Sequence, residues 1–335
     1  MAEKVIIAVD ACGGDNAPGV VLEGVEQALS QDPDLEVLLC GLPEVVEPFA
    51  SSYDRCQAHP ASQVIEMGEH PAEAVKEKKD SSIVVGCKLV KEGRAQGFFS
   101  AGSTGACLVS ATLNIGRIKG VKRPALGIIL PGAKKETFFL DVGANADVKL
   151  DYILQFAQMG CVYASSVMGA ENPKVGLLNI GEEDTKGSVF AQDAFHLLRD
   201  ELPQFAGNCE GGDLLNGDFD VVVTDGFTGN VALKCVEGTS KMLFTLLKQA
   251  FMSSTGSKLG AMLLKGSLKD LKRKVSPDTY GGSPLLGIDG VCMVGHGSSN
   301  ATAVCNGILS GCREVRAHVG DKISAMVGAS GRGVA

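Results

Sequence analysis

Acidic, glycine and hydroxyl-bearing residues follow several short apolar runs of this chain, and they are the first candidates for chemistry. After the apolar run 4–9, the stretch VDACGGDNAP brings together Asp10, Gly13, Gly14 and Asp15. Loops at the carboxyl ends of strands often carry ligand sites in α/β proteins, so this stretch could bind an anionic substrate. A strand-to-helix turn capped by Asp15 explains the same residues without a ligand.

A second turn of this kind lies in FFSAGSTGA. Its amides and hydroxyl groups could hold a phosphate at the start of a helix, and the residues concerned are Ser100, Gly102, Ser103 and Thr104. An ordinary capped helix start has the same composition. The chain contains neither the GK[ST] of a P-loop here nor a GxGxxG after its first strand, so these glycines do not form a known nucleotide-binding motif.

Three more polar side chains stand out in the second half. Lys186, in NIGEEDTKGS, could donate to a bound anion, although an ion pair with a neighbouring acid is the simpler interpretation of this segment alone. In DGFTGN, Asn230 could donate to a carbonyl oxygen that becomes negative, and a helix-cap role is equally ordinary. His296, flanked by glycines in GHGSSN, has room to meet a substrate or to hydrogen-bond within its own loop.

The sequence contains no recognisable apparatus for covalent or metal-dependent catalysis. It lacks a GxSxG elbow, an HExxH motif and a cysteine–histidine pair, and its eleven cysteines have no zinc-ligand spacing. Cys12 lies inside the first loop, but no neighbouring base would activate its thiol, so we interpret it as an apolar filler. No covalent mechanism and no zinc site therefore stand out in the sequence.

The elements that must position these residues alternate between short apolar runs and amphipathic stretches. This alternation predicts an α/β fold with a mostly parallel, doubly wound sheet. No repeat, linker or sharp boundary divides the chain, so residues 1–335 are expected to form a single catalytic domain. Further strands are predicted at 35–40, 97–100, 124–130, 137–141, 174–180 and 220–224. Helices are predicted at 20–30, 81–92, 148–168 and 187–201.

Charge and hydropathy limit the partners. The formal net charge of −8 argues against a general nucleic-acid binder, because affinity for the phosphate backbone requires a basic surface. No apolar run is long enough to cross a bilayer, and the apolar run before Asp10 is too short for a signal peptide. We therefore expect a cytoplasmic protein with reduced cysteines.

Residues 238–275 break the alternation and are expected to form a hairpin of two helices joined at SSTG. Leu259, Met262 and Leu263 are apolar residues of the hairpin, and a cluster of lysines with Arg273 follows them. An apolar tip with a basic flank fits binding to an anionic membrane. Packing of the apolar face on a second copy of the chain explains the pattern equally well. The basic cluster could also attract an acidic carrier protein.

From about residue 4 to about residue 319, the chain contains in this order VDACGGDNAP, KKDSSIVVG, FFSAGSTGA, RPALG, FLDVGANAD, VGLLNIGEEDTKG, DGFTGNVALK, YGGSPLLGIDG and GHGSS. With these motifs the chain closely resembles the bacterial phosphate acyltransferases known as PlsX. Members of this family move a long-chain acyl group from acyl carrier protein to inorganic phosphate, and the acyl phosphate serves phospholipid synthesis. Their fold is similar to the isocitrate/isopropylmalate dehydrogenase and phosphotransacetylase group.

This resemblance implies a site built from loops at the carboxyl edge of the sheet. Lys186 would offset the charge of phosphate and oxyanion, Asn230 would donate to the carbonyl oxygen, and Asp225 and His296 would orient these groups. Two positions depart from the family pattern, because Cys12 stands where Met is expected and Ser103 where Asn is expected; both keep a small or hydrogen-bonding character. The implied substrate- and phosphate-binding residues are Asp10, Gly13, Gly14, Asp15, Ser100, Gly102, Ser103, Thr104 and Asn145.

The resemblance also implies a homodimer that contacts membrane peripherally. It would use acyl carrier protein and inorganic phosphate without a metal or a redox cofactor. A downstream glycerol-3-phosphate acyltransferase is a further implied partner. Two other functions remain open on the sequence. A phosphotransacetylase-like enzyme would move a short acyl group between coenzyme A and phosphate, and a non-catalytic scaffold would only bind lipid or carrier protein.

Overall fold

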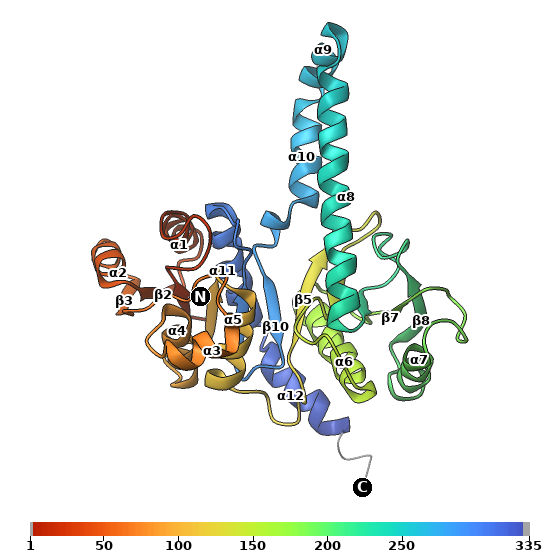
Figure 1. The fold of residues 1–335 in the computed structure, drawn as a ribbon, viewed down its shortest axis with the longest axis horizontal. Helices are drawn as coiled ribbons and strands as arrows, with labels where there is room; N and C mark the ends of the chain where they lie inside the picture. Colours follow the sequence, from red (N-terminus) through yellow and green to blue (C-terminus); the bar gives the residue numbers. More distant parts are fainter. Residues whose placement is uncertain (1–2, 331–335) are drawn as a thin grey trace.

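The computed structural model describes residues 3–330 and contains an eleven-stranded sheet flanked by helices (Figure 1). The strands are β1 (Val5–Asp10), β2 (Leu35–Gly41), β3 (Cys56–Pro60), β4 (Gly97–Ser100), β5 (Ala125–Leu130), β6 (Thr137–Leu140), β7 (Val175–Asn179), β8 (Phe205–Glu210), β9 (Val221–Val223), β10 (Ser283–Leu286) and β11 (Val291–Val294). Their spatial order is β3-β2-β1-β4-β11-β10-β5-β6-β9-β7-β8.

The helices alternate with these strands over most of the chain. They are α1 (Gly19–Gln31), α2 (Pro43–Ala50), α3 (Pro71–Glu77), α4 (Ser82–Lys91), α5 (Thr104–Ser110), η1 (Ala111–Ile115), α6 (Leu150–Ser166), α7 (Val189–Glu201), α8 (Gly226–Met252), α9 (Thr255–Leu263), α10 (Lys265–Val275), η2 (Pro277–Thr279), α11 (Ala301–Arg316) and α12 (Val319–Ser330). Each predicted strand, and each helix predicted before residue 202, is present within two residues of its expected ends.

The sheet is mostly parallel, as predicted, but its centre is antiparallel. Strand β10 runs antiparallel to both β11 and β5, and β5 runs antiparallel to β6. The group β1–β4 with β11 therefore runs opposite to the group β6–β9. The expectation that all site loops share one carboxyl edge is wrong, because the strands of the two groups end at opposite edges.

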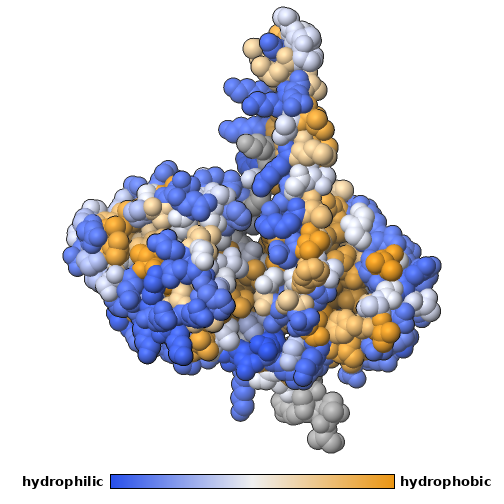
Figure 2. Space-filling model, viewed as in Figure 1, coloured by the Kyte–Doolittle hydropathy of each residue, from blue (hydrophilic) through white to orange (hydrophobic). Residues whose placement is uncertain are grey.

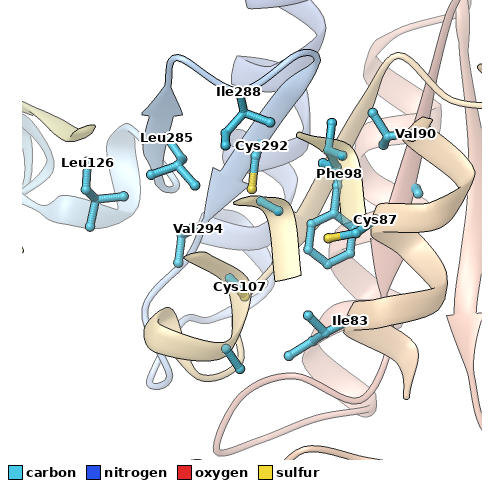
Figure 3. Packing of buried hydrophobic residues seen from close by; sticks show 14 of the residues in the cluster. Ile83, Cys87, Val90, Phe98, Cys107, Leu126, Leu285, Ile288, Cys292 and Val294 are labelled. Carbon is cyan, nitrogen blue, oxygen red and sulfur yellow. The ribbon is translucent and has the colours of Figure 1, made fainter. Parts of the chain in front are cut away.

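Alternating side chains divide the core into a layer on each face of the sheet. In β4, Phe98 packs under α4, whereas Phe99 packs on the opposite face with α1 and α11. Figure 3 shows Phe98 among the buried thiols of Cys87, Cys107 and Cys292. Burial raises the pKa of the Cys87 thiol to about 12, so it remains a protonated apolar filler.

Helices cover the two faces unequally. On one face, α4 and α5 lie over β1 and β4. Helix α8 begins on the same face, beyond β10 and β5 and next to β6 (Figure 1). On the opposite face, α1 and α11 cover one half and α6, α7 and α12 cover the other. Between α5 and α8, strands β10 and β5 lie open, and this opening positions the site described below.

Helices α8, α9 and α10 form an arm, residues 238–275, that projects from the body (Figure 1). Where the sequence predicted one returning helix there are two, which meet at Leu264. Within residues 3–330, none of the helices is both long and apolar enough to span a bilayer. The arm exposes the large apolar side chains of Met242, Leu243, Leu246, Leu247, Met252, Leu259, Met262, Leu263, Leu264 and Leu271.

Candidate active site

A cleft of about 500 Å³ lies over β10 and β5, between α5 and the first turns of α8. Figure 2 shows the molecule hollowed below the arm, between the two sides of the body. The cleft combines apolar side chains, bare glycine backbone and a few polar groups, which is the usual composition of a small-molecule site. Its polar lining includes Asp15, Thr104, Asn230, Lys234, Glu237, Asp278, Tyr280, Ser283, His296 and Ser299.

The loops after β1 and β4 support one side of the cleft through hydrogen bonds beneath its lining. The buried Asp10 carboxylate accepts hydrogen bonds from Ser100 Oγ at 2.7 Å and from the Cys12 N–H at 2.9 Å. Ser100 Oγ in turn accepts the Gly102 N–H at 3.0 Å. A Cβ on Gly13 would lie 2.5 Å from Asp10 Oδ2, so only glycine fits there. Burial raises the pKa of Asp10. Its carboxyl group ties the two loops together but does not line the cleft.

Some of the other predicted phosphate-binding residues line the cleft, and the rest hold its loops in place. Asp15 and Thr104 line the cleft, and the Asp15 N–H donates to the Gly297 carbonyl at 2.7 Å, which joins the loops after β1 and β11. Gly14 has a φ of +115°, a conformation that favours glycine in this turn. Ser103 caps α5, because its Oγ accepts the Ala106 N–H at 3.4 Å.

On the other side of the cleft, Asp141 supports the loop after β6 in the same way. This residue was not among those predicted from the sequence. Its carboxylate accepts the N–H groups of Asn145 at 2.7 Å, Ala144 at 3.0 Å and Leu126 at 3.1 Å. This turn brings Val142 and Gly143 to the cleft. Asn145, predicted to bind phosphate, donates its side-chain N–H groups to Asp141 at 2.9 Å and to the Pro124 carbonyl at 2.8 Å. The signal was present, since FLDVGANAD repeats the strand-acid-glycine order of the first loop.

One face of α8 lines the cleft. Asn230, Leu233, Lys234 and Glu237 all belong to the lining, and their spacing of three, four and seven residues places them on one side of the helix. Asn230 is exposed, while Lys234 Nζ pairs with Glu237 at 2.9 Å. Asp225 caps the helix, because its carboxylate accepts the Thr228 N–H at 2.8 Å and the Thr228 hydroxyl at 2.7 Å.

The segment after the arm and the loop after β11 complete the cleft. His296 Nδ1 accepts the Ser298 N–H at 3.2 Å and lies 2.8 Å from Ser298 Oγ, so this ring nitrogen is engaged within its own loop. Tyr280, which the sequence analysis missed, donates its hydroxyl to Glu136 at 2.8 Å. Burial and that hydrogen bond raise the pKa of Tyr280, which keeps its hydroxyl neutral. Asp278 accepts from Asn300 Nδ2 at 2.9 Å.

Lys186 does not line this cleft. It lies in the loop after β7, two strands away from β6, and its Nζ is 3.8 Å from Glu183 Oε1 in an exposed pair. The ion pair that the sequence allowed for this lysine is therefore present. Lys234 is a lysine that the cleft does contain, and it could have been found from Asn230, four residues earlier in DGFTGNVALK.

The fold is that of the phosphotransacetylases. EutD phosphotransacetylase from Staphylococcus aureus superposes with a TM-score of 0.58 and 17% identity, and 95% of each chain is covered. A branched-chain phosphotransacylase from Enterococcus faecalis superposes with a TM-score of 0.55 and 15% identity over 93% of this chain and 99% of that one. At such identities, the likeness extends to the fold alone.

Sequence comparison defines the family. A family model described as "Fatty acid synthesis protein" matches residues 5–322. A phosphate acyltransferase from Lysinibacillus sphaericus is 47% identical over 303 residues, 90% of this chain and 92% of that protein. Another, from Staphylococcus aureus, is 46% identical over 304 residues, which are 90% of this chain and 92% of that protein. The chain belongs to this family, the phosphate acyltransferases, and the resemblance found in the motifs is confirmed.

Proposed function

We propose that this chain is a single catalytic unit that transfers a long-chain acyl group from acyl carrier protein to inorganic phosphate, giving acyl phosphate for phospholipid synthesis. The observation that carries the proposal is the family match over residues 5–322, because that range includes every residue that lines the cleft. Phosphate acyltransferase is the name of the relatives that cover nine-tenths of the chain.

The proposed reaction needs positioning more than activation. Phosphate is already an oxygen nucleophile at neutral pH, so the protein must hold it beside the thioester. A phosphate oxygen bonds to the carbonyl carbon, the carbon–sulfur bond breaks, and its electron pair leaves on the sulfur of the carrier. Asn230 on α8 is our candidate donor to the carbonyl oxygen as it becomes negative, because its exposed amide lines the cleft.

Phosphate would bind on the opposite side of the cleft. Thr104, at the start of α5, offers a hydroxyl group, and Gly295 and Gly297 bring bare backbone to the lining. His296 Nε2 would donate to the phosphate or orient it, and Asp225 would act by holding the start of α8. Two lysines compete for the role of offsetting charge: Lys186, implied by the family resemblance, and Lys234, which lines the cleft.

The decisive experiment is phosphate-dependent formation of acyl phosphate from hexadecanoyl acyl carrier protein by the purified chain. Hexadecanoyl and acetyl coenzyme A serve as parallel substrates. Turnover that prefers the carrier thioester supports the proposal, whereas preference for acetyl coenzyme A supports the phosphotransacetylase alternative. Binding of carrier or vesicles without release of any carrier thiol would support the scaffold.

We further propose that the arm attaches a cytoplasmic homodimer peripherally to anionic membrane. Residues 238–275 contain eight basic residues and one acidic residue in a chain whose net charge is −8. The exposed fractions of Leu259, Met262 and Leu263 are 60%, 70% and 82%, so these side chains are free to enter a lipid interface. The same basic surface suits acidic acyl carrier protein, and attachment would bring the product to a glycerol-3-phosphate acyltransferase.

A further inference from the structure

The cleft has an apolar wall on the side of β5 and α8. It consists of Leu126, Ile128, Val142 and Leu233, which all belong to the core layer on this face of the sheet. Leu126 and Ile128 are two residues apart in β5, so their side chains point to the same face. Leu126, Val142 and Leu233 are nearly buried, while Ile128 is half-buried and more open to the cleft. The wall is thus an edge of the core left uncovered at the site.

The wall begins next to Asn230. Leu233 follows Asn230 by one helical turn on the same face of α8, so their Cβ atoms are roughly 5–6 Å apart. On the facing side, the Val142 N–H donates to the Leu126 carbonyl at 2.9 Å, and a Cβ on Gly143 would lie 3.9 Å from Asn230. A carbonyl group at Asn230 would therefore have Leu126, Val142 and Leu233 as its first apolar neighbours.

Ile128 lies farther along the same wall. Two residues of a strand span about 7 Å, so Ile128 is that far beyond Leu126 on the same face of β5. Resting on the proposed function, we infer that the wall binds the acyl chain and that Ile128 is a specificity-determining residue for its length. The methylene groups next to the carbonyl contact Leu126, Val142 and Leu233, and the methylene groups of longer chains contact Ile128.

Neighbouring isoleucines in β5 provide a matched test. Ile128 and Ile129 are both half-buried, but Ile128 packs in the layer that borders the cleft and Ile129 in the layer on the opposite face. The measurement is kcat/KM for hexadecanoyl and hexanoyl acyl carrier protein with Ile128→Phe and Ile129→Phe. We expect the ratio of the long to the short substrate to fall about tenfold in Ile128→Phe, because a misfitting group in an apolar pocket has an effect of this size. Ile129→Phe should keep the wild-type ratio.

Two further variants cover the possibility that phenylalanine prevents folding. Ile128→Leu moves a methyl branch but preserves side-chain volume, so it should change the ratio less than twofold. Ile128→Ala should lower kcat/KM for the longer substrate only. An unchanged ratio in both Ile128→Phe and Ile128→Ala overturns the inference, and so does an equal change in Ile128→Phe and Ile129→Phe. Wild-type protein that forms no acyl phosphate from either substrate would instead refute the proposed function.

Discussion

The cleft and the arm share helix α8, yet they are built in opposite ways. At the cleft, buried carboxylates of Asp10 and Asp141 hold the loops on both sides through several hydrogen bonds each. Along the arm, α9 has no buried residues, and leucines and methionines face outwards. Figure 2 shows this apolar surface along α8, continuing from the body into the arm. Hydrogen bonds within the fold hold the loops of the cleft, whereas the arm exposes apolar surface that a second surface would cover.

Asn230→Ala should produce the largest effect if the cleft is a preorganised site. Loss of one donor to a developing oxyanion typically lowers turnover roughly 10²–10³-fold. Acyl carrier protein binding should change less, because the interaction strengthens only during the reaction. Steady-state turnover and carrier binding are measured together, with Val231→Ala on the same helix as the control, since Val231 does not belong to the cleft lining. Weakened binding with normal turnover would contradict the oxyanion role.

The two lysines permit a sharper test of where the site ends. Lys186→Ala should lower phosphate-dependent turnover about 10²-fold if the family resemblance assigns its role correctly, although it lies outside the cleft. Lys234→Ala should have the larger effect if the cleft in this chain is the whole site. Both side chains are about half exposed, so neither change should lower Tm appreciably. Normal turnover in one variant removes that lysine from the mechanism.

For the arm, the test is Leu259→Glu with Leu263→Glu. Each leucine should contribute on the order of 1–2 kcal/mol to lipid binding, so the double variant should no longer sediment with anionic vesicles at any salt concentration. Raised salt should only weaken the wild type, because screening acts on the lysines and not on apolar burial. The matched control, Val189→Glu, changes an equally exposed apolar residue on α7. Continued sedimentation would exclude the arm as the anchor, and a monomeric, inactive double variant would favour dimer packing.

Sequence reasoning predicted the parallel parts of the fold better than the site between them. Strand-like runs such as 35–40 were identified because they are continuous and apolar. The central strands β10 and β11 were missed, because β10 contains Pro284 and both strands pair with distant segments of the chain. The edge strands β3 and β8 were not predicted either. The cleft lies over the central strands. Asn230, Asp15, Thr104 and His296 were identified as polar residues at turns. Lys234 could have been inferred from Asn230, one helical turn earlier, whereas Tyr280 reaches the cleft through packing that the sequence does not display.

The smallest expected effect concerns the body alone and separates it from the arm. Glu314 on α11 is buried, and its Oε2 has no hydrogen-bond partner among residues 3–330. Burial raises the pKa of Glu314 from 4.5 to about 8. In the unfolded chain this carboxyl ionises above about 4.5, whereas the folded protein keeps it protonated to about 8. The folded state thus loses stability as pH rises through this window, and the loss is complete above it.

Glu314→Gln should remove this pH dependence while keeping the shape of the side chain. Above pH 8 the wild type buries a charged carboxylate whereas the amide of the variant stays neutral, so the variant should be more stable by about 1–3 kcal/mol. The two should converge near pH 4, where the wild-type carboxyl group is neutral in both states. Urea unfolding at pH 5, 7 and 9 measures the difference. Vesicle binding should be unchanged, because Glu314 lies on α11 in the body and the exposed apolar residues of the arm do not belong to its core clusters. A stability difference that does not vary with pH would mean that Glu314 is already ionised in the folded protein, with a partner that Gln cannot replace.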